Sequence, residues 1–210
     1  DEFVSTVSHE LRTPLNAILG WASMLRTGSI DSDVVPQALE SIHRNASRQA
    51  RLVDDLLDFS RMATGRTTLD AEIIDAPNLI RGIVESVIPL AAGNQVEIQL
   101  SAIPEAALKG DVRRLEQVFV NLLGNSLKFT RAGGRIMVSA RIVGRGLEVR
   151  VADDGIGIAP EFLPHVFDRF RQGDSTTTRN HSGLGLGLSI AKQLVEAHRE
   201  DGGRHLVRER

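Results

Sequence analysis

Residues 8–15 read Ser-His-Glu-Leu-Arg-Thr-Pro-Leu and lie at the centre of the apolar repeat that decides the N-terminal fold. Over residues 2–27 one side chain in every three or four belongs to this repeat, which predicts a helix with a continuous apolar seam. The seam consists of Val4, Val7, Leu11, Pro14, Ile18, Trp21 and Leu25. His9 lies outside this seam, so we expect its imidazole to point away from the partner helix.

A second helix is predicted after a short turn. Gly28 ends the first helix, residues 31–33 offer N-caps, and Pro36 lies in the first turn of the next helix, where a missing N–H costs little. This helix is expected to run to about Ala63 and to stop at Gly65. Its predicted seam contains Leu39, Ile42, Ala46, Val53 and Leu56, interrupted by Gln49 and widened by Leu52, Leu57 and Phe59.

Two helices joined by a short turn form an antiparallel hairpin. A hairpin alone leaves much of these seams in water, whereas two copies packed as a four-helix bundle would bury them. We therefore expect residues 1–65 to be a dimerisation domain and the protein to be a homodimer. The alternative is that the apolar stripe packs on the second domain of the same chain.

The hydrophobic period changes after residue 65. Alternating apolar residues predict a β-hairpin over residues 136–151, and helical spacing reappears between the strands. We expect strands at 67–74 and 96–100, helices at 77–92, 111–130 and 187–198, and a long loop at 171–186. The first of these helices should point Leu79, Ile80, Ile83, Val84, Val87 and Ile88 inward. Residues 66–198 are thus predicted to form an α/β sandwich, which makes the chain a multi-domain α and α/β protein.

His9, Glu10 and Thr13 are candidates for histidine chemistry. An exposed neutral imidazole has a free nitrogen that can attack phosphorus. Glu10 can hold the other ring N–H and accept its proton, although neighbours on a helix do not face each other, so its side chain must swing round. Thr13 lies one turn further along, and its hydroxyl could position a water. The alternative is a solvated surface histidine, which is our interpretation of His43, His165, His181, His198 and His205.

A row of polar residues on the predicted helix at 111–130 indicates a ligand site. Gln117, Asn121 and Asn125 recur every four residues, and Lys128 follows one turn later. Buried amides cost free energy unless they are hydrogen-bonded, and bound Mg²⁺ and triphosphate would satisfy them. The amide oxygen of Asn125 suits Mg²⁺, and Lys128 can neutralise phosphate. Amides bonded to neighbouring backbone are the alternative.

Two glycine-rich segments are further candidates for binding a nucleotide. Asp153 precedes Gly155 and Gly157, where a carboxylate can accept a hydrogen bond from adenine and glycine permits close backbone approach. A second glycine series opens the last helix, whose free N–H groups favour phosphate. It consists of Gly183, Gly185 and Gly187, and the nearby Phe167 and Phe170 are expected to anchor the loop in the core. Each segment alone is a weak signal, and no Walker sequence is present.

The composition excludes several classes of protein. A net charge of −2 gives no electrostatic reason to expect nucleic acid, and the absence of cysteine excludes disulfides and thiol chemistry. No apolar run approaches the roughly 20 residues that span a bilayer. We expect no membrane contact in these 210 residues and a cytoplasmic location. The abrupt start suggests a fragment, whose parent could be anchored at the inner face of the plasma membrane.

Together these segments resemble the catalytic core of sensor histidine kinases of two-component systems. Residues 8–15 match that family's H-box, and residues 115–130 match its N-box. The first glycine box, the F-box and the second glycine box match residues 153–158, 167–170 and 183–187. Their order and spacing agree with the family across residues 1–198.

The resemblance implies a histidine phosphotransfer bundle followed by a Bergerat-type domain that binds ATP and Mg²⁺. It implies that His9 is phosphorylated with help from Glu10, and that the phosphoryl group passes to an aspartate of a response-regulator receiver. Asn125 would ligate Mg²⁺, supported by Asn121 and Lys128, and Asp153 would recognise adenine. The Glu10-x-x-Thr13 pattern is also the family's phosphatase pattern, which implies a second activity.

Residues 199–210 depart from the family pattern, which usually continues into a glycine-rich turn and one or two closing strands. Only Leu206 and Val207 are apolar there, too little for a core strand, so we expect missing strands, a disordered tail and an exposed sheet edge.

The sequence leaves two alternative functions open. One is an ATPase of the gyrase and MutL type, which forms no phosphohistidine and against which the helical hairpin argues. The other is a dimerising scaffold that is catalytically impaired by its altered C-terminus.

Overall fold

A computed structural model of the chain describes residues 2–63, 68–144, 146–171, 184–200 and 206–207. The chain forms two compact units. Unit 1 contains Asp1–Thr64 and Arg169–Leu186, and unit 2 contains Gly65–Asp168 and Gly187–Arg210. None of the described helices combines the length and the apolar character of a membrane span.

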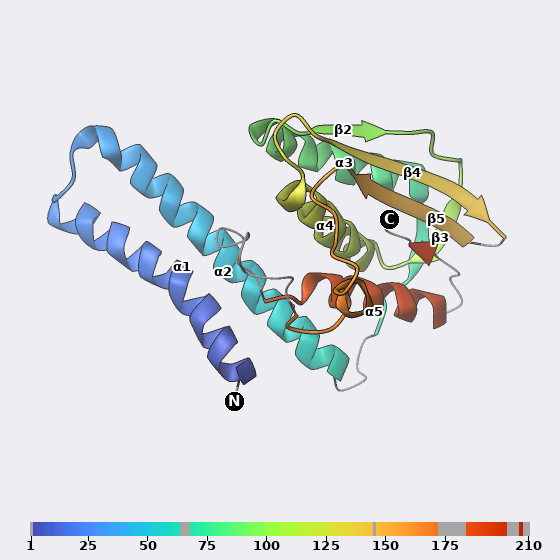
Figure 1. Cartoon of the computed structure of the whole chain (residues 1–210), viewed down its shortest axis with the longest axis horizontal. Helices are drawn as coiled ribbons and strands as arrows, with labels where there is room; N and C mark the ends of the chain where they lie inside the picture. The colour runs from blue at the N-terminus through green and yellow to red at the C-terminus, as the bar shows by residue number, and fades with distance from the viewer. Residues whose placement is uncertain (1, 64–67, 145, 172–183, 201–205, 208–210) are drawn as a thin grey trace. The chain divides into compact units, whose positions relative to one another are not determined.

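Unit 1 contains the predicted helical hairpin. Helix α1 spans Glu2–Thr27 and packs alongside α2, which spans Val35–Ala63 (Figure 1). The connection contains a short 3-10 turn, Ser32–Val34. Gly28 ends α1 with a φ of 64°, a left-handed conformation that glycine adopts without steric cost. Both predicted helices are confirmed.

In a single chain most of the predicted seam of α1 is half-buried and that of α2 is only partly buried, as expected of a hairpin that leaves much of its seams in water. Pro14 is buried, and the other seam residues of α1 are half-buried except Val4, which is exposed. Among the α2 side chains whose burial is described, Ala38 and Leu52 are the buried apolar ones, whereas three predicted seam residues, Leu39, Ala46 and Val53, are exposed. The sequence of α2 carries two apolar stripes, and the stripe through Ala38, Ile42 and Leu52 is the more buried of the two.

Unit 2 is built on a four-stranded mixed sheet. Strands β2 (Glu97–Leu100), β4 (Arg135–Val143), β5 (Gly146–Asp153) and β6 (Leu206–Val207) follow the order β2-β4-β5-β6. The central pair is the predicted antiparallel hairpin, with Ile136 opposite Asp153 and Val143 opposite Gly146. The outer strands β2 and β6 run parallel to their neighbours.

A second, two-stranded sheet pairs β1 (Glu72–Asp75) with β3 (Ala107–Gly110) in antiparallel register. Strand β1 falls at the end of the predicted strand at 67–74 and is shorter than expected. Strand β3 was not predicted, because the sequence Ala-Leu-Lys-Gly carries too few apolar residues to show a period of two.

Three helices lie on one face of the four-stranded sheet (Figure 1). They are α3 (Ala76–Gly93), α4 (Val112–Phe129) and α5 (Gly187–Glu200). Asp75 and Asp111 cap α3 and α4 by accepting hydrogen bonds from backbone N–H groups of their first turns. The buried core includes Ile80, Val84, Val118, Leu122, Ile136, Val138, Leu147, Val149, Val151, Ile190 and Leu194. These helices confirm the predicted α/β sandwich, although Ile88, predicted to point inward, is 46% exposed.

Two predictions about the C-terminal part are corrected. His198 is not a solvated residue: it is 1% exposed, and its Nε2 atom accepts a hydrogen bond from the N–H of Asp111 at 3.0 Å. The chain is also not without a closing strand, because Leu206 and Val207 pair with Glu148 and Val149 of β5. Backbone pairing with β5 therefore adds β6 to the four-stranded sheet, although its two apolar residues were too few to predict a strand.

Candidate functional site

His9 lies on α1 with its side chain 81% exposed, so the predicted outward orientation is confirmed. The residues that form the α1 seam are more buried than His9, because they lie on the other side of the helix. An imidazole in this position is open to a reactant brought by another part of the protein or by another protein. His43, on α2, is also exposed, as the sequence indicated.

The Glu10 side chain turns toward His9, although adjacent residues on a helix point in different directions. Its Oε1 atom lies 3.9 Å from Nδ1 of His9, and its side chain is only 14% exposed. The distance is longer than a hydrogen bond but within the range of a charge contact. A carboxylate at this nitrogen favours the neutral tautomer with the proton on Nδ1, which leaves the lone pair on Nε2 free.

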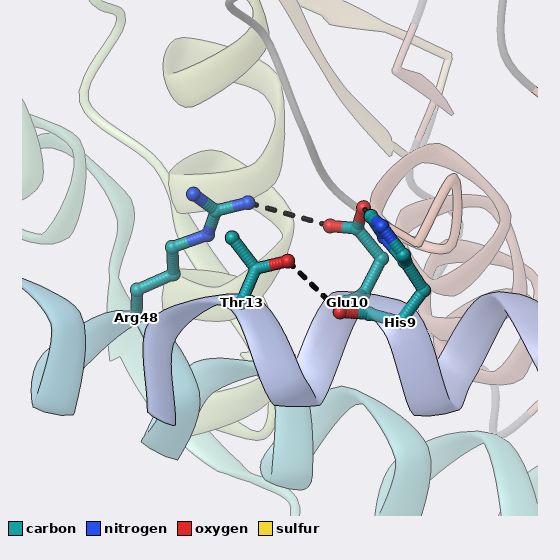
Figure 2. A network of polar contacts seen from close by, with 4 residues as sticks. All are labelled: His9, Glu10, Thr13 and Arg48. Carbon is teal, nitrogen blue, oxygen red and sulfur yellow. Dashed lines mark hydrogen bonds and ion pairs between the residues drawn. The ribbon is translucent and has the colours of Figure 1, made fainter. Parts of the chain in front are cut away.

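Two further residues complete this cluster (Figure 2). Thr13 donates a hydrogen bond from Oγ1 to the carbonyl of His9 at 3.0 Å. Arg48 reaches across from α2, with its Nη2 atom 3.3 Å from Oε2 of Glu10. Thr13 was predicted from the sequence but Arg48 was not, because Arg48 lies 38 positions after Glu10 and their contact depends on how the two helices of the hairpin are aligned.

The predicted polar row lies on α4, where its members are half-buried. The Nδ2 atom of Asn121 is buried and has no hydrogen-bond partner among the described residues. For the Nδ2 atom of Asn121, the alternative interpretation, a hydrogen bond to neighbouring backbone, is therefore wrong. Gln117 differs, because its Oε1 atom accepts a hydrogen bond from Arg114 at 2.9 Å. The Nζ atom of Lys128 lies 4.9 Å from the centre of the Phe129 ring.

The loop after β5 is attached to the C-terminal end of α4. The N–H of Ile156 donates to the carbonyl of Phe129 at 3.2 Å, and Oδ1 of Asp153 accepts from the N–H of Gly155 at 3.0 Å. A Cβ atom at Gly155 would lie only 2.6 Å from the Phe129 carbonyl, so this close approach requires glycine. Gly157 has a φ of 70°. Asp153 is thus held near the end of α4 that carries Asn125 and Lys128.

The second glycine series is divided between the two units. Gly187 begins α5 in unit 2, where a Cβ atom would lie 3.3 Å from Oδ1 of Asn121. This contact places the start of α5 beside the polar row of α4. Gly185 belongs to unit 1, has a φ of 66°, and accepts a hydrogen bond from the N–H of Phe170. Gly183 lies outside the described residues.

The two phenylalanines differ from the prediction that both anchor the loop in the core. Phe167 is 42% exposed, and the Nζ atom of Lys192 lies 5.6 Å from its ring centre. Phe170 packs edge-on against Phe59 of α2, with 5.3 Å between ring centres, so it is a packing residue of unit 1.

The donor set of unit 2 fits a magnesium–triphosphate group. A buried amide nitrogen without a partner offers a donor for a ligand, and Asn125 and Lys128 on the same helix offer an amide oxygen and a cation. Among the described residues, no group of three or more His, Cys, Asp or Glu side chains could hold a metal ion. The fit therefore rests on amide and ammonium groups.

Two family models match the chain. Residues 1–65 match the His Kinase A (phospho-acceptor) domain. Residues 110–208 match the histidine kinase-, DNA gyrase B-, and HSP90-like ATPase. The first match covers the helical hairpin, and the second covers the α/β domain from residue 110 onward.

Curated proteins and solved structures give the same result. The chain is 35% identical to hybrid signal transduction histidine kinase D of Dictyostelium discoideum, over 95% of this chain and 16% of that protein. It is 37% identical to sensor histidine kinase AruS of Pseudomonas aeruginosa, over 93% of this chain and 20% of that protein. The crystal structure of full-length ShkA in complex with AMPPNP is 31% identical, with a TM-score of 0.68, over 94% of this chain and 41% of that one. The chain thus spans less than half the length of each of these proteins.

Proposed function

Since the chain belongs to the sensor histidine kinase family, we propose that it transfers the γ-phosphoryl group of ATP to His9 and then to an aspartate of a response-regulator receiver. The observation that carries this proposal is the exposed imidazole of His9 with a carboxylate beside its Nδ1 atom. The match of residues 1–65 to a phospho-acceptor domain favours this reaction over ATP hydrolysis of the gyrase type.

In the proposed reaction, Glu10 holds the proton of His9 on Nδ1, and the lone pair of Nε2 attacks the γ-phosphorus. An Nε2–P bond forms while the bond from the γ-phosphorus to the β,γ-bridging oxygen breaks, and ADP leaves with the electron pair. The Nδ1 proton passes to Glu10, so the phosphorylated ring carries no positive charge. Thr13, hydrogen-bonded to the His9 carbonyl, is our candidate for positioning the water in a second, phosphatase activity.

The same proposal assigns ATP binding to unit 2. The amide of Asn121 would bind phosphate or a metal-bound water, and Asn125 would supply the Mg²⁺ ligand. Lys128 would neutralise phosphate charge, Asp153 would accept a hydrogen bond from adenine, and the glycines of unit 2 at positions 155, 157 and 187 would line the nucleotide. When bound, Mg²⁺ offsets the negative charge of the phosphates.

The partners we propose are a second copy of the chain and a receiver domain. Several large apolar side chains on both helices of unit 1 are exposed, and a four-helix bundle would bury such a face. They include Leu15, Leu19, Leu39, Val53 and Leu57. Both ATP and the receiver belong to the cytoplasm, where we propose that this part of the protein acts.

Radiolabelled ATP tests the proposed function directly. Incubation of the chain with Mg²⁺ and γ-labelled ATP should give a phosphoprotein that is labile in acid and stable in base. His9→Gln should abolish the label, whereas His43→Gln, which changes another exposed histidine of the hairpin, should retain it. Equal labelling of the two variants would exclude His9 as the acceptor.

Binding of the nucleotide is measured separately. Titration calorimetry with AMPPNP and Mg²⁺ should detect binding to the His9→Gln variant, because that residue lies in the other unit. Asn125→Ala should weaken binding by at least tenfold, since it removes the proposed metal ligand. If AMPPNP does not bind, the scaffold alternative holds instead.

A further inference from the structure

Arg48 is a charged residue of α2 that the reaction described above does not use. Its Nη2 atom contacts Oε2 of Glu10 at 3.3 Å, while Oε1 of the same carboxylate lies 3.9 Å from Nδ1 of His9 (Figure 2). The two oxygens of one carboxylate are therefore divided between a guanidinium and the imidazole. We propose that Arg48 is a positioning residue that holds Glu10 against Nδ1 of His9 during phosphoryl transfer. This inference rests on the proposed function.

The first argument is geometric. Successive side chains on a helix point about 100° apart, so Glu10 has no intrinsic reason to lie beside His9. A contact from outside α1 can fix the side-chain conformation that brings them together. Arg48 comes from α2, 38 residues away, and makes this contact.

The second argument is electrostatic. The Glu10 side chain is 14% exposed, and a carboxylate in such a place is costly without a cation or hydrogen bonds. Arg48 is 34% exposed and provides a charge-assisted contact. Without this cation, the ionised carboxylate has less reason to remain in its half-enclosed place beside the imidazole. It would turn toward water, and the proton on Nδ1 would lose its acceptor.

The position of Arg48 distinguishes it from neighbouring arginines of α2. Arg44, one turn earlier, is exposed, and Arg51 donates from Nε to the carbonyl of Ser47. Arg44→Gln removes the same charge from the same helix and is therefore the matched control for Arg48→Gln.

Steady-state autophosphorylation gives the first test. Arg48→Gln should lower kcat by roughly tenfold, part of the effect expected of a positioned proton acceptor, and should leave KM for ATP within about twofold. Arg48→Lys should recover part of the lost rate because it keeps the charge, and Arg44→Gln should match the wild type. A raised KM with unchanged kcat would overturn the inference, because it would place Arg48 at the nucleotide.

A double-mutant cycle tests whether Arg48 acts through Glu10. Arg48→Gln should lower kcat by less than about twofold when Glu10→Gln is already present, since the carboxylate it holds is then gone. Equal losses in both backgrounds would overturn the inference. The proposed function would still hold in that case, provided that His9 of the wild-type protein is phosphorylated.

The tautomer of His9 supplies a readout that needs no ATP. Imidazole ¹⁵N shifts of the folded chain, assigned by their loss in His9→Gln, should show Nδ1–H enriched in the wild type and in Arg44→Gln. Both Arg48→Gln and Glu10→Gln should shift the population toward Nε2–H. An unchanged tautomer in Arg48→Gln would overturn the inference whether or not the chain proves to be a kinase.

Discussion

Asp55 lies half-buried on α2, close to Asp54 and to the buried Asp58. Burial, together with the negative charges of Asp58 and Asp54, raises the pKa of Asp55 from its ordinary value of 3.8 to about 6. The folded chain therefore binds this proton more tightly than the unfolded chain. The resulting contribution to stability is complete below about pH 4, decreases as the pH rises to about 6, and is absent above that.

Asp55→Asn should remove this dependence, because an amide does not ionise. Allowing for screening at a half-buried site, the variant should be more stable than the wild type by on the order of 1 kcal/mol at pH 7. At pH 3.5 the two should be equally stable, because both side chains are then neutral. Urea unfolding of the whole chain at several pH values measures the difference, and a constant offset across the range would contradict this explanation.

At the scale of residues, the sequence predicted which side chains face outward from a single helix. It did not predict a side-chain contact between two helices. The exposure of His9 follows from the seam of α1 alone. The polar row of Asn121, Asn125 and Lys128 follows in the same way from α4. The contact of Arg48 with Glu10 depends on how α1 and α2 are aligned, and helical periodicity does not determine that alignment.

At the scale of elements, the exposed apolar face of the hairpin predicts self-association. Leu19 on α1 is 57% exposed, and each apolar side chain of this kind contributes roughly 1.5–3 kcal/mol when buried. Leu19→Glu should therefore weaken the dimer, because it would place a charge in the interface. Asn16→Glu adds the same charge at another exposed position of α1 and should leave the dimer intact. Light scattering after size exclusion distinguishes them, and a monomeric wild type would contradict the prediction.

Comparison of the predicted and observed elements shows which sequence patterns are sufficient to predict a helix or a strand. Long amphipathic helices and the alternating hairpin of β4 and β5 were found with nearly correct bounds, because each carries many periods of its pattern. Strands β3 and β6 were missed, because four and two residues are too few to show a period and their pairing depends on neighbours. On α2, Leu39 and Val53 form a second apolar stripe that stays exposed in a single chain, so burial within one hairpin does not test their place in the predicted seam.

At the scale of the whole molecule, both units join segments that are far apart in the sequence, and the sheet of unit 2 is completed by a strand near the end of the chain. In unit 2, β6 joins β5 from a position 58 residues further along the chain, since Leu206 pairs with Glu148 (206 − 148 = 58). Only two of the eight residues of β5 have a partner in β6. The contribution of β6 to stability is therefore expected to be measurable but small.

Truncation after residue 205 tests this expectation. It removes the two paired residues of β6, and with hydrogen bonds contributing about 0.5–1.5 kcal/mol each, unit 2 should lose roughly 1–2 kcal/mol. The melting temperature should fall by a few degrees, and the freed edge of β5 should increase aggregation on heating. Truncation after residue 207 keeps β6 and should melt like the full chain. If both truncations melt alike, pairing of β6 contributes nothing, and the original expectation of an open sheet edge would describe the protein in solution.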